Sequence, residues 1–430
     1  MANVKPHLES LMKRRIFAAL LLIVFTVLPA IAAESFLKPN DTVAIAGDSI
    51  TEQKEYSVFI QDYLLMCQPA PNLRTTQFGW SGETAPGFLS RMANDVLWLK
   101  PSVATTCYGM NDGGYSPIDD AKAKRYKNAQ RGIVQLFKGA GTRLIIIGSP
   151  GVVDADTYRN NPEQAAMYNK TLAAFRDISQ ETARQETVAF ANVFDAMMAA
   201  MTKAKAKYGP KYHVAGGDGV HPDKNGQLIM AYAFLKAMGC DGNIGSITVD
   251  LAANTASASD GHKVLSSQAP TIELESSRYP FCFFGNPSSP SSTAGIIEFF
   301  PFNDDLNRLT LIVKNPGADR LKITWGQSTR EFPAADLAKG VNLAAEFLDN
   351  PFCDPFRKVE QAIRAQQNYE TQLHKQLMHD LPTYRNAVPD ESDAIDRIAA
   401  AVQRKDAVLA AVSAAAVIPV KHTIKIEPAK

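Results

Sequence analysis

Between about residues 40 and 240, short runs rich in β-branched residues alternate with longer stretches of helical periodicity. The strand candidates are residues 42–46, 73–78, 103–108, 144–147 and 188–190. The helical stretches between them include residues 121–137, 162–185 and 223–238. This alternation predicts an α/β fold with a parallel sheet covered by helices on both faces. Parallel sheets of this type bind ligands at the carboxyl ends of their strands, so the residues directly after each strand are the candidates for chemistry.

The pattern changes near residue 240, which predicts further regions after an α/β domain at 34–240. A β-rich region is expected at 241–332, with strand-like runs at 247–251, 271–274, 296–300, 309–313 and 321–325. Residues 315–319 are typical of a hairpin turn between the last two runs. A helical region is expected at 333–416, and residues 417–430 are expected to be a polar tail. Nothing in residues 241–416 assigns them a role.

The first 32 residues have the features of a secretory signal peptide. A basic cluster, Lys13 to Arg15, precedes an apolar run at 16–31, and Ala-Ile-Ala at 30–32 supplies a small-residue cleavage site. The run is short for a membrane span. We therefore expect a secreted or periplasmic protein with no stable membrane insertion after cleavage; an uncleaved anchor is the alternative.

Charge and cysteine content exclude several classes of protein. Lys and Arg number 45 and Asp and Glu 44, for a formal net charge of +1, without the basic excess of a nucleic-acid binder. Removing the first 32 residues takes away four basic residues and one acidic one, which leaves the chain slightly acidic. Five cysteines are too few for a disulfide scaffold, although Cys282 and Cys353 could pair. No Cys or His spacing is typical of a metal site, so no metal site is expected.

Four motifs follow the predicted strands or close the α/β domain. Ser49 lies in Gly-Asp-Ser-Ile at 47–50, and Gly82 lies in a Gly-containing turn at 79–84. Asn111 is followed by Asp112, and Asp218 precedes His221 by three residues. Each motif has a commoner structural explanation when taken alone. Ser49 could be a helix N-cap, and the Gly and Asn-Asp motifs could be turns. His213 is a rival to His221 but lacks an aspartate at the same offset.

Taken together and in this order, the four motifs resemble those of the SGNH hydrolases, also called GDSL-type esterases, over about residues 40–240. The resemblance implies a flavodoxin-like three-layer α/β/α fold and a serine ester hydrolase that needs no cofactor. It implies Ser49 as nucleophile, His221 as general base and Asp218 as its orienting carboxylate. It also implies an oxyanion hole made by Ser49, Gly82 and Asn111. Gly79 is a nearby alternative to Gly82.

The substrate is less constrained than the reaction. Predicted export and an appended β-rich region favour a small ester or an acylated carbohydrate, with removal of acetyl or another short acyl group. Trp80 and Trp325 could stack on a sugar, although core packing is the simpler explanation for Trp325. The alternatives are a lipase or lysophospholipase, an acyltransferase, or a carbohydrate-binding scaffold without turnover. The oligomeric state cannot be predicted.

Overall fold

The computed structural model describes residues 36–429, so the predicted signal peptide at 1–32 lies outside the described residues and stays a prediction. Five parallel strands form the first sheet, in the order β2-β1-β3-β4-β5. Their bounds are Thr42–Gly47 for β1, Arg74–Gly79 for β2, Val103–Cys107 for β3, Leu144–Gly148 for β4 and Ala189–Ala191 for β5. This order is the flavodoxin-like one, so the α/β prediction is confirmed.

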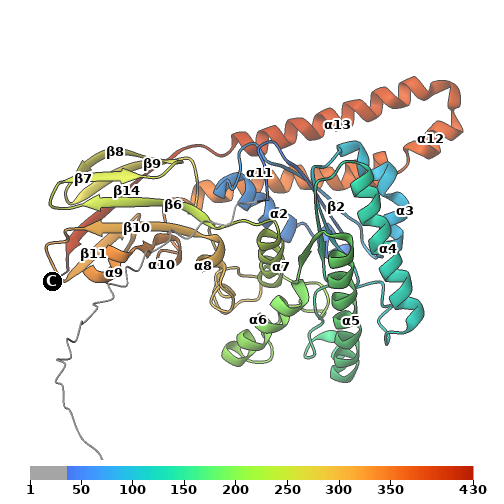
Figure 1. Cartoon of the computed structure of the whole chain (residues 1–430), viewed down its shortest axis with the longest axis horizontal. Coiled ribbons are helices and arrows are strands. Elements are labelled where there is room, and N and C mark those ends of the chain that lie inside the picture. Colours follow the sequence, from blue (N-terminus) through green and yellow to red (C-terminus); the bar gives the residue numbers. More distant parts are fainter. Residues whose placement is uncertain (1–35, 430) are drawn as a thin grey trace, which may run out of the picture. The chain divides into compact units, whose positions relative to one another are not determined.

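Helices cover both faces of this sheet, as Figure 1 shows. The bounds are Ser49–Glu52 (α1), Tyr56–Asp62 (α2), Ala85–Asp95 (α3), Asp120–Gly139 (α4), Pro162–Glu186 (α5), Val193–Tyr208 (α6) and Lys224–Ala237 (α7). Shorter segments are Tyr63–Cys67 (η1), Leu97–Leu99 (η2) and Tyr158–Asn160 (η3). Alternate residues of β1 serve the two layers. Val43 and Ile45 pack with α2, α6 and α7, whereas Ala44 and Ala46 pack with α3, α4 and α5.

Two further sheets follow. The second has the order β13-β10-β6-β7, and the third has the order β12-β11-β14-β9-β8. Their strands are Asn243–Asp250 (β6), Thr255–Ala258 (β7), His262–Gln268 (β8), Thr271–Ser276 (β9), Arg308–Lys314 (β10), Arg320–Trp325 (β11), Ser328–Pro333 (β12), Val341–Asn342 (β13) and Val420–Pro428 (β14). The helical elements are Phe302–Leu306 (α8), Ala334–Lys339 (α9), Leu343–Glu346 (α10), Cys353–Gln372 (α11), Leu373–Met378 (η4), Leu381–Ala387 (α12), Pro389–Glu391 (η5) and Ser392–Ala415 (α13).

Three expectations for the C-terminal half are wrong. Residues 420–428 are not a polar tail but β14, the central strand of the third sheet, with buried residues alternating along it. Residues 315–319 do form a bent connection, but β10 and β11 belong to different sheets and form no hairpin. Residues 296–300 form turns and bends in place of a strand.

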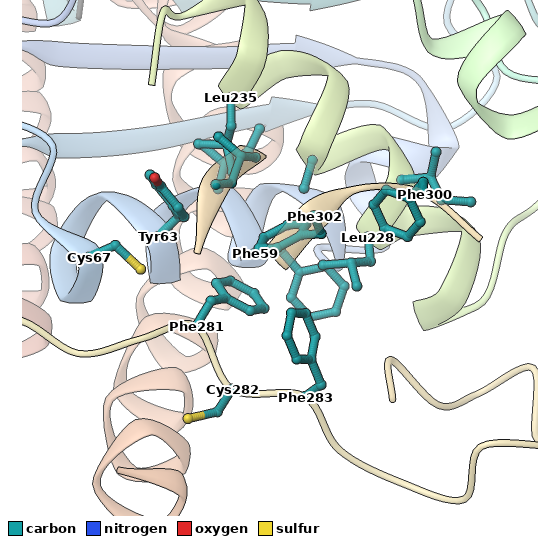
Figure 2. Packing of buried hydrophobic residues seen from close by; sticks show 14 of the residues in the cluster. Phe59, Tyr63, Cys67, Leu228, Leu235, Phe281, Cys282, Phe283, Phe300 and Phe302 are labelled. Carbon is teal, nitrogen blue, oxygen red and sulfur yellow. The ribbon is translucent and has the colours of Figure 1, made fainter. Parts of the chain in front are cut away.

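An aromatic cluster joins the β-rich region to the α/β domain. Figure 2 shows Phe281 and Phe283 on an extended segment facing Phe59 of α2 and Leu228 of α7. The ring centroids of Phe59 and Phe281 lie 6.3 Å apart, and those of Phe281 and Phe302 lie 5.0 Å apart. Buried aromatic pairs of this kind add to the free energy gained by area burial. The two regions therefore share one hydrophobic core.

The long helices α11 and α13 pack against each other (Figure 1). α11 runs toward the α/β domain, where it contacts α2 and β2, and α13 leads back toward β14. Within residues 36–429, no helix is long and apolar enough to cross a membrane. All five cysteines are buried free thiols, so the pairing considered for Cys282 and Cys353 is not formed here.

Candidate active site

Ser49 is the first residue of α1, directly after β1. Asp48 caps this turn, and its Oδ1 accepts a hydrogen bond from the Ile50 N–H at 3.0 Å. Gly47 is required for the close approach of α1, because a Cβ there would meet Thr51 Oγ1 at 2.1 Å. The strand and the turn together hold Ser49 at the carboxyl-end edge of the sheet, next to the point where strand order reverses.

A chain of hydrogen bonds connects Ser49 to two residues of the loop before α7. Ser49 Oγ lies 2.8 Å from His221 Nε2, and His221 Nδ1 lies 2.6 Å from Asp218 Oδ2. Asp218 Oδ1 also accepts from the backbone N–H groups of Val220 and His221, each at 2.9 Å. Partial burial would raise the pKa of Asp218, but these hydrogen bonds hold it below its ordinary value. Asp218 is thus kept as a carboxylate facing the imidazole.

The same loop depends on Gly216, whose φ is +87°. A Cβ there would meet the carbonyl oxygen of His221 at 1.7 Å. The rival His213 does not bond to Ser49; its Nδ1 lies 3.3 Å from Asp223 Oδ2. The structure therefore brings Ser49, Asp218 and His221 together and leaves His213 outside this chain of bonds.

Gly82 and Asn111 lie on the loops that follow β2 and β3. Asn111 Nδ2 donates to the carbonyl oxygen of Glu83, next to Gly82, at 3.0 Å, and the Tyr115 hydroxyl donates to Asn111 Oδ1 at 3.3 Å. Asp112 ties the two loops together by accepting from the N–H groups of Ala85 and Gly109, both at 3.0 Å. One amide proton of Asn111 remains for another acceptor.

The two glycines of the β2 loop have different surroundings. A Cβ on Gly79 would meet the backbone N of Glu52 at 2.3 Å, so Gly79 is needed for packing against α1. Gly82 has a φ of +74° and is exposed, and a Cβ added to it would meet nothing within 4 Å. Gly79 is thus needed for packing, whereas the exposed position of Gly82 favours Gly82 as the ligand-facing glycine.

Three buried carboxyl groups lie beside the site. Burial raises the pKa of Asp48 to about 7 and that of Asp112 to about 6. Burial also raises the pKa of Glu83, although Arg91 donates to both of its carboxylate oxygens, at 2.6 and 2.7 Å. Tyr108 adds a third donor to Glu83 at 3.0 Å. Glu83 and Arg91 therefore form a doubly hydrogen-bonded ion pair that supports the loop carrying Gly82.

Three residues outside the motifs, Glu52, Lys375 and His379, surround the loop that carries Gly82. Glu52, on α1, accepts from the backbone N–H and the hydroxyl of Ser81, and it pairs with Lys375 of η4 at 2.8 Å. The half-buried Trp80 ring lies 4.8 Å from His379. Lys375 and Glu52 are 323 positions apart, so no local pattern signals their contact.

The remaining expectations concern tryptophan and metal. Trp325 is fully buried and its Nε1 donates to His422 Nδ1 at 3.1 Å, so it is a core residue that no sugar reaches. Within residues 36–429, no cluster of His, Cys, Asp or Glu has the arrangement of a metal site.

Known proteins resemble this chain in sequence and in fold. Residues 45–229 match the model of the GDSL-like Lipase/Acylhydrolase family. No curated protein matches the chain. Among solved structures, a gut microbial diltiazem-metabolizing enzyme is 21% identical, with a TM-score of 0.69 over 91% of this chain and 98% of that chain. A catalytic mutant of an acetylxylan esterase from Geobacillus stearothermophilus is also 21% identical, with a TM-score of 0.39 over 47% of this chain and 96% of that chain. The first likeness extends the shared fold beyond the matched domain.

Proposed function

We propose that this protein, whose residues 45–229 match the GDSL-like Lipase/Acylhydrolase family, is an ester hydrolase that removes acetyl or other short acyl groups from a carbohydrate, with Ser49 as the nucleophile. The observation that supports this assignment most is the continuous chain of hydrogen bonds from Ser49 through His221 to Asp218. A serine hydroxyl needs such a base, and the base needs such a carboxylate, to act as a nucleophile near neutral pH.

In the first half-reaction, Ser49 Oγ attacks the carbonyl carbon while His221 Nε2 takes the hydroxyl proton. Asp218 holds Nδ1–H and stabilises the imidazolium. The N–H groups of Ser49 and Gly82 and the free amide proton of Asn111 would hold the oxyanion. The alcohol leaves with the proton from His221, and Ser49 is left acylated. His221 then takes a proton from water as the water oxygen attacks the acyl carbon. When the intermediate collapses, the bond between the acyl carbon and Ser49 Oγ breaks, His221 returns the proton to Ser49 Oγ, and the acid is released.

Polar and aromatic groups next to the site support a sugar as the alcohol part. Tyr115 bonds to Asn111, and the Arg159 guanidinium lies 4.9 Å from the Tyr115 ring. Among residues 36–429, no carboxylate pairs with Arg159, so its N–H donors face solvent beside an aromatic ring. Rings and free donors suit a substrate rich in hydroxyl groups.

A large apolar cavity lies in the C-terminal helical region, away from Ser49. A cavity of about 390 Å³ is lined only by side chains of η4, α12, α13 and their connections, such as Leu381, Tyr384 and Ile395. Neither Ser49 nor His221 lines it. This cavity is therefore separate from the proposed nucleophile and is not its acyl-chain site.

A chromogenic acetyl ester tests the reaction and Ser49 together. We expect hydrolysis by the wild type and a loss of about 10⁴-fold or more in kcat for Ser49→Ala. Ser90→Ala is the matched control, since the exposed Ser90 hydroxyl bonds only to the carbonyl oxygen of Gly87. Equal hydrolysis by Ser49→Ala, or none by the wild type, would overturn the proposal.

The same assay, with acyl length and alcohol varied, tests the substrate. We expect kcat/KM to fall from acetyl to long-chain esters, and an acetylated oligosaccharide to be deacetylated. A preference for long chains would support a lipase, and transfer to an added acceptor sugar in place of hydrolysis would support an acyltransferase.

A further inference from the structure

We propose that the C-terminal helical region takes part in the reaction through Lys375, a positioning residue that acts on the Gly82 loop by way of Glu52. The inference rests on the proposed ester hydrolysis at Ser49. It assigns a role to a region that lies outside the family match at 45–229. Lys375 belongs to η4, a π-helical continuation of α11, and irregular turns of this kind occur often at functional sites.

The contacts form a direct link between the two regions. Lys375 Nζ donates to Glu52 Oε1 at 2.8 Å. The other oxygen of Glu52 accepts from the backbone N–H of Ser81 at 2.5 Å and from its hydroxyl at 2.6 Å. Glu52 is three residues after Ser49 on α1, and Ser81 directly precedes Gly82. One carboxylate therefore ties the helix of the nucleophile to the loop of the proposed oxyanion donor.

Charge explains why this link needs a cation. Burial would raise the pKa of Glu52, but Lys375 and the two donors of Ser81 hold it below its ordinary value. Both side chains are mostly buried, with 20% of Glu52 and 25% of Lys375 exposed. An ion pair that is shielded in this way has a better-defined geometry than one at the surface. Lys54 does not replace Lys375, because its Nζ donates to the backbone oxygen of Glu52.

The Trp80 ring adds a second contact to the same loop. Lys375 Nζ lies 4.9 Å from the ring centroid, at the same distance as Arg91 Cζ, and the His379 ring lies 4.8 Å away. Cations at this distance are attracted by the ring face. The backbone N–H of Trp80 donates to the carbonyl oxygen of Gly47 at 3.0 Å, so the loop is fixed at its start as well. Removing Lys375 leaves Glu52 without its counter-ion and Trp80 without one of its packing partners.

The test is steady-state kinetics on the chromogenic acetyl ester. Lys375→Met keeps the apolar stem and removes the charge. We expect kcat to fall about 10-fold, less than the 10²–10³-fold loss of a whole oxyanion donor, with KM unchanged and the thermal midpoint close to that of the wild type. Lys375→Arg should restore most of kcat. Lys358→Met, an exposed lysine on α11, is the matched control and should leave kcat unchanged.

A double-mutant cycle separates positioning from general damage to the fold. Glu52→Gln should lower kcat to a similar extent. The kcat of the double variant Glu52→Gln with Lys375→Met should be no lower than that of the less active single variant. The inference would be overturned if Lys375→Met kept the wild-type kcat, or if the two losses in kcat multiplied in the double variant. The proposed function would still stand in that case, provided that Ser49→Ala is inactive. A wild type without hydrolysis would overturn both.

Discussion

At the scale of single residues, the residue before Ser49, the proposed nucleophile, has a raised pKa. Asp48 is 3% exposed, and burial raises its pKa to about 7. The Ile50 N–H opposes this shift by bonding to the carboxyl group, whereas Asp112 and Glu83 add to it. Between its ordinary pKa and 7, the folded protein therefore holds a proton on Asp48 that the unfolded chain has released.

This difference predicts a pH dependence of stability. Since the folded state binds more protons in that window, raising the pH from about 4 to about 7 favours the unfolded chain. Asp48→Asn keeps the acceptor for Ile50 but cannot ionise. We expect the difference in thermal midpoint, Asp48→Asn minus wild type, to increase as the pH rises across this window and to stay constant above it. Thermal unfolding at a series of pH values checks this, with the exposed Asp390→Asn as control. A difference that does not vary with pH would contradict the raised pKa.

At the scale of elements, α11 protects the edge of the parallel sheet. β2 is an edge strand, and its backbone groups would otherwise be open to another chain. Glu370 accepts from the backbone N–H of Gln77 at 2.8 Å, and Gln366 donates to the carbonyl oxygen of Thr75 at 3.2 Å. Gln61 of α2 donates to Gln366 at 2.8 Å. Side chains of one helix thus replace the hydrogen bonds of a missing strand.

Truncating the centre of this network should be costly. Gln366→Ala leaves the Gln61 donor and the Thr75 oxygen without partners, and we expect a loss of about 1–3 kcal/mol in the free energy of unfolding. Gln361→Ala, on the exposed side of the same helix, should change it by no more than about 0.5 kcal/mol. Urea denaturation followed by circular dichroism measures both. Equal effects of the two substitutions would show that the buried bonds contribute nothing.

The same elements show what the sequence could and could not predict. The parallel strands and the Ser49–His221–Asp218 set were predictable, because buried strands are continuous apolar runs and each motif follows a strand or closes the domain. β14 was missed because its buried residues, such as Ile424 and Ile426, alternate with Lys and Thr, and the polar half dominated the interpretation. Lys375 was missed because its partner lies 323 positions away, and only the docking of α11 brings the two together.

At the scale of the whole molecule, the chain leaves the third sheet after β12, packs α11 against the α/β domain and α13 on α11, and returns as β14. Arg74 of β2 pairs with the buried carboxylate of Asp406 on α13, which fixes the outer helix as well. Residues 36–429 accordingly lie in one compact unit. Damage to the third sheet should therefore reach the active site.

A single substitution in β14 tests this coupling. Ile424 is fully buried, so Ile424→Asp buries an unpaired carboxyl group, and we expect a loss of about 3–5 kcal/mol. Thr423→Asp adds the same charge to the exposed face of the same strand and should have little effect. In urea, ester hydrolysis and circular dichroism should be lost at one shifted midpoint. A separate early transition with activity intact would show that the third sheet unfolds independently.

The central position of β14 also bears on how the chain folds during synthesis. β14 pairs with β9 through Val420 and Ser276 and with β11 through Leu321 and Pro428. It is synthesised after all other strands of its sheet. The edges of β9 and β11 that pair with β14 therefore stay unpaired until β14 has been synthesised. Pairing over such long sequence separations is slow. A chain interrupted before residue 420 would carry two unpaired strand edges, which makes the period between synthesis of β11 and arrival of β14 the one most exposed to aggregation.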